Sequence, residues 1–133
     1  MPDESKNKID LKIKDCFPRI VFREPYFNNG MHYNILGTGF NENLFANNAY
    51  RLNKLHVSED FFELLSIYEA LESTSGKFTM LELGCGYGFW IANTIKLIRD
   101  YFHIPYGIIG IEAEPYHYDW AFDALRESNT DLE

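Results

Sequence analysis

The stretch LELGCGYGFW at residues 81–90 constrains the fold more than any other part of this sequence. Gly84, Gly86 and Gly88 occupy alternate positions directly after the apolar run FTMLEL and directly before a second apolar stretch. Glycine adopts positive φ without steric cost and lets a ligand approach the backbone closely. A glycine turn between a strand and a helix is typical of the ligand-binding edge of a parallel α/β sheet.

The segments around this turn predict the other elements of such a sheet. Before the turn, Ser58 is a plausible N-cap of a helix whose apolar residues recur at helical spacing. After the turn, residues 91–102 have one apolar face, YGIIGIEAEP indicates a buried strand, and Pro115 opens a further helix. This order predicts an α/β fold with a parallel sheet and flanking helices.

The part of the chain before Ser58 has a different character. We interpret residues 1–57 as a leader or cap segment and residues 58–133 as the unit that carries the glycine turn. Alternating apolar residues over 9–13 predict a short edge strand, and residues 19–22 predict another. Residues 25–53 are irregular and rich in Asn, Gly and aromatic side chains. We expect these aromatics to pack on the rest of the chain, as an ordered leader or as a lid.

The composition limits the classes of function. At 133 residues with 46% hydrophobic content, the chain has apolar material for one modest core, so we expect one globular unit. A net charge of -8 argues against a nucleic-acid partner. No apolar run approaches the roughly 20 residues that span a bilayer, and the first ten residues lack the apolar core of a signal peptide. We therefore expect a cytoplasmic protein with a small-molecule substrate and no membrane partner.

Cysteines and histidines indicate neither a disulfide framework nor a metal site. Cys16 and Cys85 are the only cysteines, and no C-x-x-C pair is present. Cys85 lies inside the glycine turn, where we interpret it as a small side chain in a tight place rather than a reactive thiol. The histidines lack the H-x-x-x-H spacing of metal ligands and are interpreted as surface or packing residues: His32, His56, His103 and His117.

The glycine spacing separates two classes of nucleotide-binding turn. A dinucleotide-binding loop, G-x-G-x-x-G, would require a third glycine at position 89, which is Phe89. The sequence instead has an acid, one residue and then G-x-G-x-G, from Glu82 to Gly88. LELGCGYG resembles the first motif of the class I S-adenosylmethionine-dependent methyltransferases.

The resemblance implies a partial Rossmann-like sheet and S-adenosylmethionine as cofactor. In that family the glycine turn runs under the methionine and ribose portions of the cofactor, and the acid near the strand end helps to receive its cationic amino-acid portion. Carried over to this chain, Glu82 would hold that cation. The floor of the site would be formed by Gly84, Cys85, Gly86 and Gly88.

The family also has an acid at the end of its second strand, which accepts hydrogen bonds from both ribose hydroxyls. Glu112 and Glu114 compete for this role. Glu114 directly precedes Pro115, where the start of a helix favours a negative charge by itself. We therefore prefer Glu112 and keep Glu114 as the second choice. GIEAEPYHYDWAFDAL is also similar to the FkbM-like methyltransferases, a branch associated with O-methylation of sugar or polyketide hydroxyls.

The resemblance covers residues 58–133, one half of the family's seven-stranded fold. We therefore interpret the chain as the N-terminal part of a longer enzyme that transfers a methyl group to an oxygen or nitrogen, and no catalytic residue can be named. An open sheet edge predicts self-association into a homo-oligomer. Two alternatives remain: a fragment of a nicotinamide-dependent oxidoreductase, and a non-catalytic domain that acts through self-association.

Overall fold

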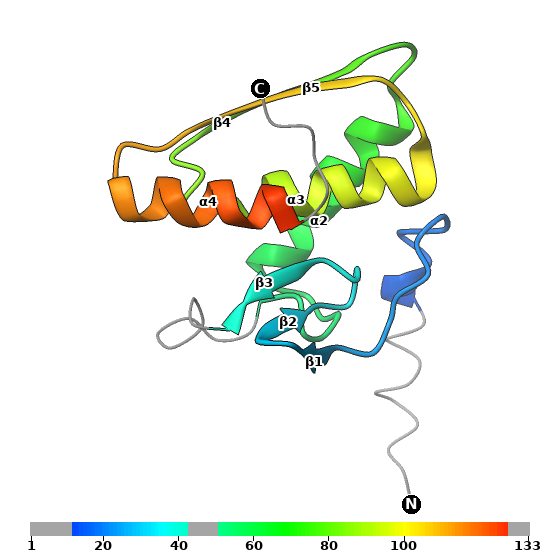
Figure 1. Ribbon diagram of the computed structural model, residues 1–133. Coiled ribbons are helices and arrows are strands. Elements are labelled where there is room, and N and C mark those ends of the chain that lie inside the picture. The colour runs from blue at the N-terminus through cyan, green and yellow to red at the C-terminus, as the bar shows by residue number, and fades with distance from the viewer. Residues whose placement is uncertain (1–11, 43–50, 128–133) are drawn as a thin grey trace, which may run out of the picture.

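The computed structural model describes residues 12–42 and 51–127, which form a mixed α/β structure (Figure 1). Its elements, in chain order, are β1 (Tyr26–Asn28), β2 (Met31–Tyr33), β3 (Gly39–Asn41), α2 (Glu59–Glu72), β4 (Phe78–Leu83), α3 (Phe89–Leu97), the π-helix η2 (Ile98–Phe102), β5 (Tyr106–Ile111) and α4 (Pro115–Glu127). No helix within the described residues is long and apolar enough to cross a membrane.

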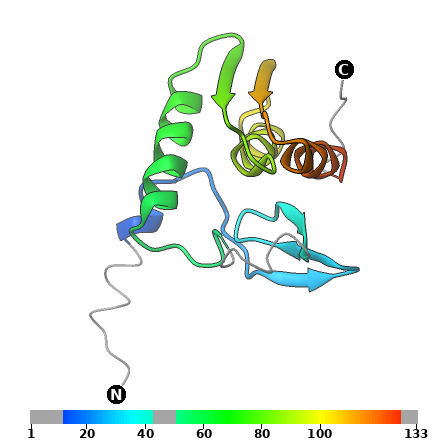
Figure 2. The ribbon, with the colours of Figure 1, turned by 90° about the vertical axis from the view of Figure 1, so that its left-hand side faces the viewer.

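Strands β4 and β5 form a two-stranded parallel sheet, as the alternation of strands and helices predicted. Their register places Glu82 opposite Gly110 and Leu83 opposite Ile111. Helices α3 and α4 lie on one face of this sheet, and α2 stands beside the outer edge of β4 (Figure 2). The connection from β4 to β5 runs through α3 and η2, which is the crossover that parallel strands require.

Gly110 in β5 permits a close approach of α3 to the sheet. A Cβ atom at this position would overlap the side chain of Ile91 and would lie 3.0 Å from the sulfur of Cys85. A larger residue would therefore require the side chain of Ile91 to move.

Local sequence signals set the helix ends. The Ser58 hydroxyl accepts a hydrogen bond from the backbone N–H of Phe61 at 3.3 Å, which confirms the predicted N-cap. Pro115 is the first residue of α4, also as predicted. The apolar face over residues 91–102 predicted one continuous helix, but its last part is π-helical from Ile98 to Phe102. In this last part the N–H of His103 bonds to the carbonyl of Ile98 at 2.6 Å.

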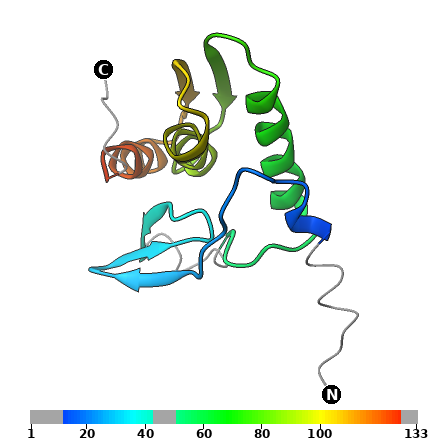
Figure 3. The same cartoon turned by 90° about the vertical axis from the view of Figure 1, so that its right-hand side faces the viewer.

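The N-terminal segment contains a three-stranded antiparallel sheet in the order β1-β2-β3 (Figure 3). Asn29 and Gly30 form the two-residue turn between β1 and β2, both with positive φ, as an Asn-Gly hairpin requires. The interpretation of residues 25–53 as irregular was therefore wrong where these three strands form. The strand predicted at 19–22 was also wrong, because residues 20–25 join no sheet. Of the strand predicted at 9–13, residues 12 and 13 are helical and the others lie outside the described residues.

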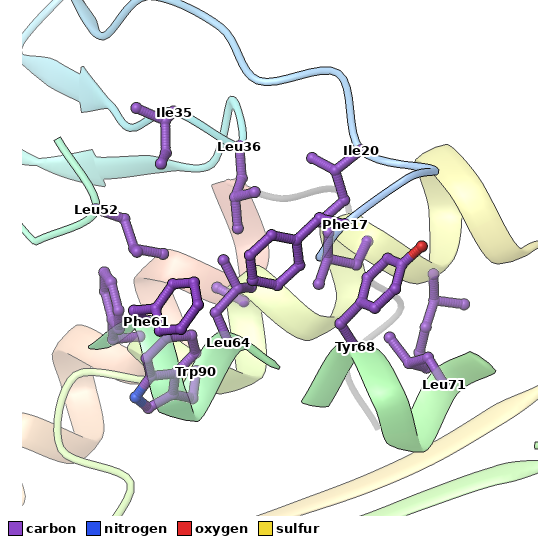
Figure 4. Close-up of a cluster of buried hydrophobic side chains, with 14 of the residues drawn as sticks. Phe17, Ile20, Ile35, Leu36, Leu52, Phe61, Leu64, Tyr68, Leu71 and Trp90 are labelled. Carbon is purple, nitrogen blue, oxygen red and sulfur yellow. The ribbon is translucent and has the colours of Figure 1, made fainter. Parts of the chain in front are cut away.

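One hydrophobic core joins the N-terminal segment to the α/β unit (Figure 4). Phe17 is 1% exposed and packs edge-on against Phe61 and Tyr68 of α2, with ring centroids 5.7 and 5.4 Å apart. A buried hydrogen bond of 3.0 Å from the amide nitrogen of Asn34 to the amide oxygen of Asn93 links the segment to α3. The prediction that this segment packs on the rest of the chain is confirmed.

Candidate functional site

The glycine turn is anchored to the end of β5. The backbone N–H groups of Gly84 and Cys85 both donate to the carbonyl of Ile111, at 2.7 and 3.1 Å. Gly84, Gly86 and Gly88 have φ values of 69°, 56° and 78°, a region that residues with a side chain rarely adopt. Backbone hydrogen bonds therefore hold the turn at the carboxyl end of the sheet, and its conformation depends on the positive φ values of the glycines.

The three glycines do not serve the same purpose. A Cβ atom at Gly84 or Gly86 would meet no other atom within 4 Å, so the backbone there borders open space. A Cβ atom at Gly88 would lie 3.2 Å from the Cα of Ala121 in α4. Gly84 and Gly86 thus offer bare backbone to a ligand, whereas Gly88 lets α4 pack against the turn. The sequence pattern treated all three alike.

Glu112 lies beside this open backbone. Its carboxylate accepts hydrogen bonds from the N–H of Gly86 and the N–H of Glu114, both at 2.8 Å. The bonds from Glu114 and Gly86 lower the pKa of Glu112, so the group is ionised at neutral pH. Glu114 instead turns toward the start of α4, where its carboxylate lies 3.4 Å from the N–H of Tyr116. The structure thus brings Glu112, and not Glu114, to the glycine turn.

Glu82, which lies in β4 just before the glycine turn, has a different environment from that of Glu112. Burial, followed by the negative charge of Glu63, raises its pKa to about 7, and the opposing effect of Arg51 is smaller. Its Oε2 atom is buried without a hydrogen-bond partner among the described residues. At neutral pH this carboxyl group therefore titrates, in contrast to Glu112.

Glu82 lines a pocket of about 500 Å³ between α2 and β4. Its walls combine apolar side chains with carboxyl groups, and they consist of Glu59, Phe62, Glu63, Ser66, Ile67, Met80, Leu81, Glu82 and Trp90. The Oε2 atom of Glu63 is buried without a hydrogen bond in the described part of the chain, but it lies in an ion pair 3.8 Å from the guanidinium of Arg51. The pocket thus has carboxyl groups from two consecutive elements, α2 and β4.

Arg51 is a residue near this site that the sequence pattern did not indicate. Its guanidinium donates to both carboxylate oxygens of Asp60, with the shortest distance 2.7 Å, and lies 3.8 Å from Glu63. It also stacks over the ring of Phe89, 3.9 Å from the centroid. Arg51 therefore connects the N-terminal segment to α2 and to the start of α3. No local pattern marks it, because none of these partners is a near neighbour in sequence.

Cys85 is 9% exposed. Burial raises its pKa, and the negative charges of Glu82 and Glu112 raise it further. This agrees with the interpretation of Cys85 as a packing residue in the turn. Among the described residues, no group of three His, Cys, Asp or Glu side chains is arranged to hold a metal ion.

Comparisons with known proteins provide no relative for this chain. No family model, no curated protein and no solved structure matches it. The geometry of the site is therefore the basis for assigning a function.

Proposed function

We propose that this chain is the cofactor-binding part of a class I S-adenosylmethionine-dependent methyltransferase, with a Rossmann-like half-sheet. The observation that carries the proposal is the bare backbone at Gly84 and Gly86 beside the ionised carboxylate of Glu112. These features lie at the carboxyl ends of parallel strands, where α/β sheets bind their ligands. They match the sequence motif that resembles the family.

Glu112 is suited to a diol such as ribose. Each of its oxygens accepts one backbone N–H, and a carboxylate oxygen can accept more than one hydrogen bond. Both oxygens can therefore still accept a bond from neighbouring hydroxyl groups. The two backbone bonds also hold the carboxylate in one orientation before a ligand arrives, which lowers the entropic cost of binding.

The open space over Gly84 and Gly86 fits the rest of such a cofactor. A side chain at either position would occupy the space that the ligand needs, and glycine has none. When bound, the cofactor supplies an electrophilic methyl group on a sulfonium ion. The contribution of this chain would be to position the cofactor and to exclude water, which can provide a large effective molarity without a covalent intermediate.

The nicotinamide-dependent alternative is disfavoured by position 89. Phe89 is 2% exposed and packs against Phe40 and Arg51, so it belongs to the core and not to a phosphate-binding loop. A dinucleotide-binding turn would have glycine there so that the helix could pack closely on the strand.

A second candidate function is self-association without catalysis. The face of the β4–β5 sheet opposite α3 and α4 carries Leu81, Leu83, Ile109 and Ile111, which are between 52% and 73% exposed. A contiguous apolar face of this kind is typical of a protein–protein interface.

Isothermal titration calorimetry with S-adenosylhomocysteine and, separately, with NAD tests the proposal. We expect saturable binding of S-adenosylhomocysteine, no binding of NAD, and at least tenfold weaker binding by Glu112→Ala. Glu114→Gln serves as the matched control and should bind as the original chain does. A folded chain, verified by circular dichroism, that binds neither ligand would contradict the proposal, and concentration-dependent dimerisation would then favour the second candidate.

A further inference from the structure

Two residues with side chains, Cys85 and Tyr87, alternate with the glycines of the turn and pack into different parts of the protein. Cys85 belongs to a small buried cluster whose other buried members are Ile91, Ile95 and Ala121. Tyr87 packs against the large core that joins the N-terminal segment to the α/β unit. The side chains between the glycines therefore anchor the turn on two sides.

The glycines give the turn open space but do little to hold its conformation. Glycine has more conformational freedom to lose than any other residue when a backbone becomes fixed. The positive φ values at Gly84, Gly86 and Gly88 are therefore easy to reach and also easy to leave. Two backbone bonds to the carbonyl of Ile111 fix the start of the turn. The side chain of Tyr87 is the anchor nearest to its end.

The ring of Tyr87 contacts an aromatic residue of the N-terminal segment. Phe40 of β3 is 1% exposed, and its ring meets the ring of Tyr87 edge-on with the centroids 5.8 Å apart. The Phe40 ring also stacks on Phe89, the first residue of α3, at a centroid distance of 5.2 Å. Both arrangements are favourable for aromatic pairs. One buried ring of the N-terminal segment therefore contacts both the turn and the helix that follows it.

Buried amide hydrogen bonds form a second link from the N-terminal segment to the start of α3. Asn34 and Asn93 are both 0% exposed. The amide oxygen of Asn34 accepts bonds from the N–H groups of Leu36 and Thr38, at 3.0 and 3.2 Å. Its amide nitrogen donates to Asn93 at 3.0 Å, and Asn93 in turn donates to the carbonyl of Phe89 at 2.9 Å. A buried network whose groups are bonded to one another specifies one arrangement of the elements that it joins.

Arg51 forms a third link. Its guanidinium lies 3.9 Å from the centroid of Phe89, and its bond to Asp60 holds it there. Figures 2 and 3 show the antiparallel sheet of the N-terminal segment beneath α3 and α4, on the side away from β4 and β5. The contacts of Asn34, Phe40 and Arg51 thus converge on the end of the turn and the first residues of α3.

We propose that the N-terminal segment determines the conformation of the glycine turn, with Tyr87 as the positioning residue through which Phe40 acts. For the ligand, this inference rests on the proposed function: a turn that is held in one conformation before S-adenosylmethionine arrives binds it with a lower entropic cost. The N-terminal segment is then a determinant of cofactor affinity as well as part of the core. Because coupling between two binding events is reciprocal, the bound cofactor should also stabilise the docked N-terminal segment.

The test compares Phe40→Leu with the matched variant Phe17→Leu. Both phenylalanines lie in the N-terminal segment and are 1% exposed, but Phe17 packs on Phe61 and Tyr68 of α2. Urea denaturation should show a similar loss of stability in both variants. Isothermal titration calorimetry should show at least fivefold weaker binding of S-adenosylhomocysteine by Phe40→Leu, and less than a twofold change by Phe17→Leu.

The pKa of Glu112, measured by ¹³C NMR without ligand, reports on the turn independently of the proposed function. Bonds from the N–H groups of Glu114 and Gly86 lower this pKa, and the second bond is lost if the turn changes conformation. We expect the pKa to rise in Phe40→Leu and to stay unchanged in Phe17→Leu. The same pKa in both variants would overturn the inference. A rise in Phe40→Leu alone, in a chain that binds no S-adenosylhomocysteine, would support the inference and contradict the proposed function. Equal affinities of the two variants for S-adenosylhomocysteine would overturn the inference and leave the proposed function intact.

Variants of Tyr87 test its positioning role directly. Tyr87→Phe keeps the ring and should bind S-adenosylhomocysteine within twofold of the original chain. Tyr87→Ala should bind it at least tenfold more weakly and have a raised pKa of Glu112, in a chain whose folding is verified by circular dichroism. Equal affinities of these two variants would overturn the role assigned to the ring of Tyr87.

Discussion

Glu82 in β4 and Glu112 directly after β5 lie at the same edge of the parallel sheet, but their surroundings have opposite effects on them. Glu112 is partly buried and accepts two backbone N–H bonds, which lower its pKa. Glu82 is half-buried beside Glu63, and burial raises its pKa to about 7. Both acids lie at the carboxyl end of their strand, but the two carboxyl groups have different protonation states at neutral pH.

Under the proposed function, this difference corresponds to two different tasks. A permanently charged carboxylate fixed by the backbone is suited to hold neutral hydroxyl groups in one orientation. A carboxyl group that titrates near neutral pH is suited to a cation or to proton transfer. The difference between the two pKa values comes from the groups around each side chain. Removing those groups should therefore change the pKa values.

The largest effect is expected for Arg51→Met, on the Glu82 side of the comparison. This change removes the paired bond to Asp60 and the stacking on Phe89, and should lower the free energy of unfolding by about 2 kcal/mol. It should also raise the pKa of Glu82 further, because Arg51 normally opposes the rise, and leave Glu112 unchanged. Urea denaturation and ¹³C NMR of the carboxyl groups measure both effects.

Arg126→Met is the control for that variant. Arg126 pairs with Asp123 at 3.3 Å, but both side chains are more than half exposed. An exposed pair contributes little, so the free energy of unfolding should change by less than about 0.5 kcal/mol. A similar loss of stability in Arg51→Met and Arg126→Met would mean that Arg51 contributes no more than an exposed ion pair does.

A smaller effect is expected for Gly86→Ala, on the Glu112 side. The positive φ of this residue should make alanine destabilising by about 1 kcal/mol, and a distorted turn would weaken the bond to Glu112. The pKa of Glu112 should then move up toward its ordinary value. Gly76→Ala is the matched control, since Gly76 also has positive φ and open space around it but lies away from the turn. Gly76→Ala should lower the free energy of unfolding by a similar amount and leave the pKa of Glu112 unchanged. Equal pKa values of Glu112 in the two variants would show that this pKa does not depend on the conformation of the turn.

An effect of similar size concerns the pH dependence of stability. Because the folded pKa of Glu82 lies above the ordinary value of 4.5, its protonation stabilises the fold below pH 4.5, and this stability is lost as the pH rises through 7. Glu82→Gln should remove that loss and be more stable than the original chain at pH 8 by about 1 kcal/mol, a value reduced for solvent screening of a half-exposed group. Urea denaturation at pH 4 and pH 8 measures it.

Glu112→Gln should have the opposite dependence on pH. The pKa of Glu112 is lowered, so its charged form stabilises the fold above the ordinary carboxyl pKa, and that stability is lost as the pH falls. The free energies of unfolding of Glu112→Gln and of the original chain should therefore differ above the ordinary carboxyl pKa and become equal in acid. The same direction of change in both variants would show that the two acids do not differ as described.

Signals between near neighbours in sequence determined much of the α/β unit. The Ser58 cap, the glycine turn and the start of α4 at Pro115 were predicted correctly. Each depends on backbone preferences and hydrogen bonds within a few residues, which the local sequence encodes directly. The strand from Tyr106 to Ile111 was also predicted, but its predicted burial was wrong, because its last three residues are exposed and no helix in the described part of the chain covers the outer face of the sheet. The choice of Glu112 as the ribose ligand remains a prediction.

Only the tertiary structure decided how the candidate site is built. It separated Gly88, which packs on α4, from Gly84 and Gly86, and it brought Arg51 and Glu63 to the region of Glu82. It also formed three strands in a segment that the sequence pattern left irregular. Burial, open space and charge pairing arise between residues far apart in the chain. Such properties depend on how the elements pack together, and no short stretch of sequence contains that information.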